Sequence, residues 1–251
     1  MKENSGLCKL CGFEKVLCKS HIIPKAVFRD AMADDKEHGL NKITDQRLEI
    51  GKMAGEYEYL LCRDCEELVG KYDEYGIKFL RQEVGQGLVE FNGETVPDDI
   101  QLLSEVDLEK LRLFIISVLW RASISSREFF SDVTLEQCEI TAKQLIKKEL
   151  DLTEYLFPFI IGKYSGHPAA DKIIIKPGLV VIEGVNFCNL NMTGFNFTVK
   201  VDPRPLPQRL TILWNVLVEK KTVLVYKKDF GSSKEYEGIK WLVRSAAASR
   251  G

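Results

Sequence analysis

The stretch "LCKLCGFEKVLCKSHIIP" at residues 7–24 holds two cysteines two residues apart, and "LLCRDCEEL" at residues 60–68 repeats that spacing. A CxxC turn presents two sulfurs from one tight bend, and Gly12 after the first pair lets the chain turn back. A structural zinc takes four such ligands in a tetrahedron. The two pairs therefore predict one zinc site, whose ligands are Cys8, Cys11, Cys62 and Cys65.

A second ligand set shares the first stretch. Cys8, Cys11, Cys18 and His21 form a compact C-x2-C-x6-C-x2-H array, which would use His21 as a ligand and leave the second pair unused. We favour the two pairs because together they already supply four ligands. Cys18 is then expected to be a core thiol.

The composition is that of an ordinary soluble protein, with 251 residues, 45% hydrophobic and 29% charged. The most apolar run, residues 113–120, is too short to span a membrane, and the N-terminus lacks the apolar segment of a signal peptide. Seven cysteines, an odd number with CxxC pairs, suit metal binding in a reducing compartment better than a disulfide framework. We expect a cytoplasmic protein without a membrane partner.

The charge is distributed unevenly along the chain. Residues 1–100 carry 14 Lys+Arg against 20 Asp+Glu, a net −6, whereas residues 101–251 carry 21 against 17, a net +4. Proteins that grip duplex DNA through many phosphates usually show a basic footprint, and the cysteine-bearing end shows none in its net charge. Lysine-rich stretches at 218–222 and 226–234 either protect a sheet edge or form a nucleic-acid surface.

Patterning predicts three segments and a tail. Residues 1–95 form the zinc finger and a helix that opens at Cys62, where apolar residues begin to recur at three and four. Residues 96–165 read as helical, with Asp107 and Thr134 as N-caps. Residues 166–245 read as β-rich, and residues 246–251 as a tail.

The predicted fold class is α+β: a zinc-braced treble-clef or ββα finger, a helical middle segment and a C-terminal mainly antiparallel sheet. The strands of that sheet are expected in "DKIIIKPGLVVIEG", "GFNFTVKV", "LTILWNVLVE" and "KTVLVYKKDF". Polar, glycine-punctuated residues 30–58 read as an insertion between the two halves of the finger.

The order of these motifs resembles the HNH family of His-Me finger endonucleases. A zinc knuckle, a His followed by Ile-Ile-Pro, and a second knuckle that opens a helix match the variant braced by a four-cysteine zinc. The resemblance implies a nuclease that hydrolyses DNA or RNA phosphodiesters, with purely structural zinc. His21 matches the general base, and Glu66 stands where a ligand for catalytic Mg²⁺ or Mn²⁺ is expected.

The sequence also departs from that family. Ser20 stands where the family usually has an acidic residue or His before the base, and Tyr57 stands where it usually has Asn. A rival hypothesis is a non-catalytic, zinc-stapled module that binds nucleic acid, or a protein partner through the C-terminal half. His21 would then be a half-buried imidazole, and Glu66 a first-turn acid that stabilises its helix. Arg121 either pairs with an acid or contacts a phosphate.

Overall fold

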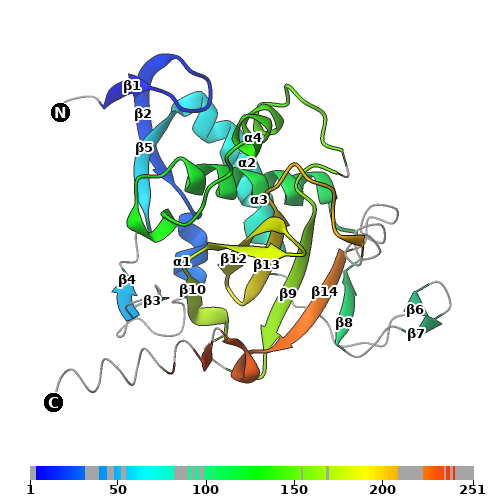
Figure 1. The fold of residues 1–251 in the computed structure, drawn as a ribbon. Coiled ribbons are helices and arrows are strands. Elements are labelled where there is room, and N and C mark those ends of the chain that lie inside the picture. The colour runs from blue at the N-terminus through cyan, green and yellow to red at the C-terminus, as the bar shows by residue number, and fades with distance from the viewer. Residues whose placement is uncertain are drawn as a thin grey trace.

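The computed structural model describes the following residues: 4–31, 40–43, 48–51, 55–81, 90–91, 94–95, 99–103, 105–153, 155–167, 170–208, 223–234, 236–237 and 240. Within them the fold is α+β, as predicted, and helices α2 and α3 lie between the three-stranded sheet of an N-terminal finger and a six-stranded sheet (Figure 1). Two features expected from the sequence lie outside the described residues, the strand at 210–219 and the tail at 246–251.

The finger is a three-stranded antiparallel sheet followed directly by a helix. Its strands are ordered β1-β2-β5, and the helix is α2, which starts one residue after β5 ends. The bounds are β1 Ser5–Leu7, β2 Glu14–His21, β5 Tyr57–Cys62 and α2 Arg63–Leu80. A β-bulge between Cys18 and Lys19 shifts the pairing of β2 with β5. The predicted hairpin followed by a helix is therefore present.

The insertion between β2 and β5 contains regular structure and reaches the C-terminal part of the chain. Its elements are α1 Lys25–Ala31, β3 Leu40–Ile43 and β4 Leu48–Gly51. Strand β3 pairs antiparallel with β4 and parallel with β10, which spans Ile173–Ile175. Helix α1 contacts both β10 and the short helix η2 (Ala170–Lys172). The insertion is thus tied to residues more than 100 positions away.

Helix α3 (Leu108–Ser123) is the buried centre of the molecule. Its N-cap is Asp107, as predicted, whose side chain accepts a 3.0 Å hydrogen bond from the Lys110 amide. Helix α4 (Cys138–Ile146) packs on α3 and begins later than a cap at Thr134 predicts. The reason is Glu136, whose φ of 41° lies in the left-handed region and interrupts a helix there.

The C-terminal sheet has the order β11-β12-β13-β9-β14-β8 and is antiparallel except where β14 runs parallel to β9. Two of its strands, β8 and β9, come from the segment predicted to be helical, because short apolar runs do not distinguish a buried strand from a helix. The bounds are β8 Ile100–Leu103, β9 Phe159–Ser165, β11 Gly178–Ile182, β12 Val185–Met192, β13 Phe195–Lys200 and β14 Val223–Asp229. Smaller elements are β6 Glu90–Phe91, β7 Glu94–Thr95, η1 Glu128–Phe130 and η3 Phe230–Ser232.

One hydrophobic core joins the finger, the helices and the sheet. Phe79 of α2, for example, lies 5.6 Å from the ring of Phe195 and 6.5 Å from that of Phe197, both on β13. Buried residues of all three predicted segments belong to the same cluster. Among the helices that the structure describes, none is long and apolar enough to cross a membrane.

Candidate metal centre and the cleft beside it

The two CxxC pairs come together at the top of the finger. Residues Cys8 and Cys11 lie in the turn between β1 and β2, while Cys62 ends β5 and Cys65 lies in the first turn of α2. Their sulfur atoms all lie within 4.8 Å of one another, and the sulfurs of Cys11 and Cys62 are 3.9 Å apart. The four side chains therefore form a cluster that can hold one metal ion.

The dimensions of this cluster fit zinc. Four sulfurs at about 2.3 Å from a tetrahedral ion lie about 3.8 Å from each other. Burial alone would raise the pKa of Cys8, but amides that include those of Cys11 and Cys62 outweigh it and lower that pKa to about 7. Burial raises the pKa of Cys65. A cation among the four sulfurs would favour the thiolate form of all of them, since metal binding releases thiol protons.

Neither Cys18 nor His21 belongs to the cluster. Both lie on β2, beyond the turn that carries the first pair, and Cys18 is half-buried in the hairpin. The arrangement matches the predicted set of two pairs and differs from the compact array that would use His21. His21 is thereby left for another role.

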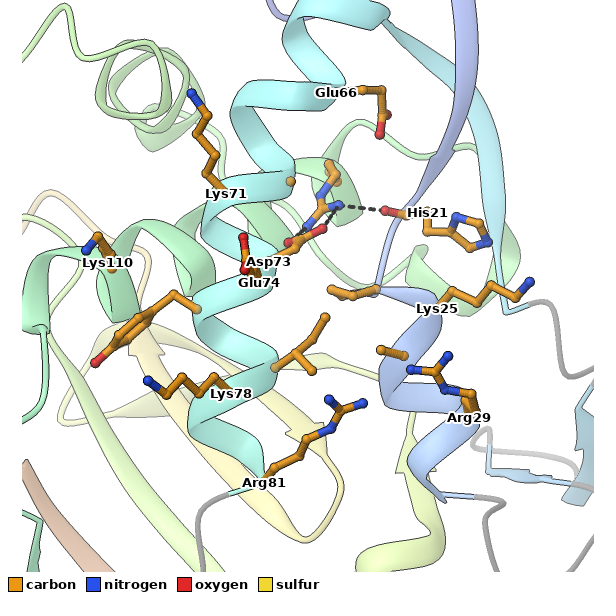
Figure 2. Close-up of a pocket in the computed structure, with 16 residues that line it drawn as sticks. His21, Lys25, Arg29, Glu66, Lys71, Asp73, Glu74, Lys78, Arg81 and Lys110 are labelled. Carbon is orange, nitrogen blue, oxygen red and sulfur yellow. Dashed lines mark hydrogen bonds and ion pairs between the residues drawn. The ribbon is translucent and has the colours of Figure 1, made fainter.

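His21 is the last residue of β2, paired with Tyr57 on β5. Its ring is half-buried and lies 6.0 Å from the ring of Tyr57. Figure 2 shows the imidazole directed toward the side of α1 that carries Lys25, whereas the carboxylate of Glu66 is directed toward the space between α2 and β2. The two predicted catalytic side chains therefore line one cleft without pointing at each other.

The backbone of His21 is held by Arg121 from α3. The Arg121 guanidinium donates a 2.8 Å hydrogen bond to the His21 carbonyl and two more, of 2.9 and 2.6 Å, to the carboxylate of Asp73 on α2 (Figure 2). Its Nε donates to the carbonyl of Ser117 at 3.2 Å. Arg121 is 1% exposed. Of the two roles considered from the sequence, the structure places Arg121 in the structural one.

Ser20 is fully buried and contributes to the fold. Its hydroxyl accepts a 3.2 Å hydrogen bond from the amide of Leu61 on β5. Behind it, Glu66 lies in the first turn of α2, where burial raises the pKa of its carboxyl and hydrogen bonding to Ser20 opposes that rise. Within the described part of the chain, the Oε1 atom of Glu66 is buried and has no hydrogen-bond partner. A buried carboxylate oxygen of this kind suits a divalent cation.

His21 and Glu66 share a cleft of about 870 Å³ whose lining comes from β2, α1, α2 and α3. Its floor is the exposed side of α2, with α1 on one flank (Figure 2). Three acids line it, Glu66, Asp73 and Glu74. Besides Arg121, six basic side chains line it: Lys25, Arg29, Lys71, Lys78, Arg81 and Lys110. The cleft is therefore cationic, although the first hundred residues carry a net negative charge.

The chain was compared with family models, curated proteins and solved structures. None of them matches it. The resemblance to the HNH family therefore rests on the motif order alone, and the chemistry of the cleft has to be argued from its own side chains.

Two parts of this site are missing from the sequence prediction. The pair Asp73–Arg121 joins residues 48 positions apart, so no local spacing indicates it. The net charge of the first hundred residues does not reveal the cationic lining, because acidic residues elsewhere in that segment outnumber the basic ones. A helical projection of α2 places Lys71 and Lys78 on one face, since seven residues are about two turns, and is the one signal that points to this lining.

Proposed function

We propose that this protein is a metal-dependent nuclease that hydrolyses nucleic-acid phosphodiesters, with a structural zinc in the four-cysteine cluster. The observation that carries the proposal is the cleft itself, where a histidine lies among basic side chains with a buried carboxylate oxygen that finds no hydrogen-bond partner among the described residues. Phosphodiesters are anionic, so such a lining favours their binding. Zinc held by four cysteines has no open coordination position and cannot act on substrate.

In this proposal His21 is the general base that accepts a proton from the attacking water. Glu66 would hold Mg²⁺ or Mn²⁺ through its buried oxygen, and that ion would offset the charge that develops on the phosphate. The basic side chains orient the phosphodiester backbone. The hydrogen bond from Arg121 to the His21 carbonyl fixes the end of β2, and so limits where the imidazole can lie.

The test is cleavage by the purified protein of supercoiled plasmid, single-stranded DNA and RNA, with Mg²⁺ or Mn²⁺ against EDTA. We expect metal-dependent cleavage that falls at least about 100-fold in His21→Ala, the usual contribution of a general base. His167→Ala is the matched control, because His167 packs against Phe230 and Tyr236, away from the cleft. Equal cleavage by His21→Ala and wild type would refute the role of His21.

One observation favours a second function, a non-catalytic module that binds nucleic acid. Ser20 stands where the HNH nucleases that the motif order resembles usually carry a metal-ligating acid or His, and here its hydroxyl is used within the fold. Under this hypothesis the wild-type protein leaves all three substrates intact with either metal. It nevertheless binds them, and His21→Ala binds equally well.

A further inference from the structure

Three lysines of the cleft have no carboxylate partner within the described residues. They are Lys25 at the start of α1 and Lys71 and Lys78 on α2, all exposed. Other basic side chains of the same lining are paired: Arg81 with Asp30 at 2.7 Å and Lys110 with Asp107 at 2.9 Å. Figure 2 shows Lys71 and Lys78 on the side of α2 away from His21, and Lys25 on the flank formed by α1, so an anionic backbone that lies across the cleft meets cations on both flanks.

The spacing of these lysines fits a nucleic-acid backbone. Lys71 and Lys78 are seven residues apart on one helix, which sets their Cα atoms about 10 Å apart along its axis. That separation is enough for the two lysines to contact different phosphates of one flexible strand. Lys25 lies on α1, on the side of the cleft toward which the His21 ring is directed (Figure 2).

The size of the cleft indicates one strand. Its volume of about 870 Å³ is within the range of pockets that enclose small ligands, roughly 300–1,000 Å³. A few nucleotides of a single strand fit such a volume, whereas the two paired strands of a duplex exceed it. Unpaired strands are bound by this kind of positively charged groove, which follows one backbone.

We propose that the cleft selects single-stranded nucleic acid, with Lys25, Lys71 and Lys78 contacting consecutive parts of one phosphate backbone that leads to His21. This inference rests on the proposed function, because it names the substrate of the same site. Glu74 also lines the cleft, between the two lysines of α2, and opposes an anionic ligand. The negative charge of Glu74 therefore lowers the affinity of the cleft for nucleic acid.

The test measures binding apart from cleavage. Fluorescence anisotropy of a labelled single-stranded 12-mer is followed in EDTA over a salt series, for the full chain and for the variant Lys25→Gln, Lys71→Gln, Lys78→Gln. Each lost phosphate contact reduces the salt slope by about 0.7 for single strands, so the triple variant should lose about 2 from the slope. Glu74→Gln should bind more tightly, and wild type should prefer the single strand to the same sequence in a duplex.

Lys234→Gln is the matched control, an exposed lysine in the other lysine-rich stretch, away from the cleft. Unchanged salt dependence in the triple variant overturns the inference, as does equal affinity for duplex and single strand, or an equal effect of Lys234→Gln. The two proposals fail separately. Single-strand binding that depends on the three lysines without any cleavage keeps this inference and refutes the nuclease, and cleavage with an unaltered triple variant does the reverse.

Discussion

The guanidinium of Arg121 is the residue-scale link between three elements of the cleft. It reaches from α3 to Asp73 on α2 and to the His21 carbonyl at the end of β2. Burial raises the pKa of the Asp73 carboxyl, and the Arg121 charge opposes that rise. Removing one partner of a buried ion pair leaves an uncompensated charge, which costs far more than losing an exposed pair.

Arg121→Met is therefore expected to destabilise the fold by about 3–5 kcal/mol, measured as the free energy of unfolding in urea. Arg81→Met is the matched control, because Arg81 makes the same two-bonded contact with Asp30 but is 50% exposed. That change should cost no more than about 1 kcal/mol. Equal losses in the two variants would show that burial of the Arg121 pair does not govern its contribution.

Arg121→Lys addresses the position of His21 separately from stability. Lysine keeps the charge but cannot form the planar fork that serves Asp73 and the His21 carbonyl together. If the proposed nuclease is active, kcat should fall while KM changes little, since the lysines that bind substrate are untouched. A higher KM with an unchanged kcat would contradict this positioning role.

At the scale of elements, the approach of α2 to α3 depends on a glycine. A Cβ atom on Gly76 would lie 2.2–2.4 Å from ring atoms of Phe114, closer than any real contact. Gly76→Ala is expected to destabilise the protein by about 1–3 kcal/mol, because the two helices must separate. Gly70 on the same helix has open space around its position, so Gly70→Ala should stabilise by up to about 1 kcal/mol. The measurement is the thermal midpoint of each variant. If both substitutions shift the midpoint in the same direction, the proposed difference in packing at the two glycines is wrong.

The sequence predicts those elements whose signal is local. Each CxxC pair lies within one turn, and Asp107 caps its own helix, so both can be predicted from residues that are close in sequence. Contacts between distant residues are not readable in this way. Asp73 and Arg121 become a buried pair only because α2 packs on α3 and removes both side chains from water. The apolar run of β9 is compatible with a helix, and its pairing with β13 and β14 makes it a strand.

At the scale of the whole molecule, the four-cysteine cluster joins the start of the chain to α2, which lies in the common core. Native mass spectrometry should find one zinc per chain. Because the finger shares its core with the rest of the fold, chelation is expected to lower the thermal midpoint by about 10 °C or more, a loss of several kcal/mol. Only local fraying on chelation, with an unchanged midpoint, would contradict this.

Cys65→Ser should lose the metal and reproduce the effect of chelation. Cys18→Ser is the matched control, since Cys18 lies in the same hairpin but outside the cluster, and it should retain one zinc. Loss of zinc from Cys18→Ser with retention in Cys65→Ser would restore the compact ligand set.

The parallel pairing of β3 with β10 sets an order of events during synthesis. All four cysteines have been synthesised once residue 65 is made and emerge from the ribosome soon afterwards, so the finger can take up metal early. Strand β10 follows β3 by roughly 130 residues, a delay on the order of ten seconds at cellular translation rates. Helix α1, one flank of the cationic cleft, contacts β10 and η2 and gains its final support only then. A nascent chain that takes up metal early would therefore hold its metal centre before it holds a finished cleft, so the function proposed for the cleft would begin only when the fold is nearly complete.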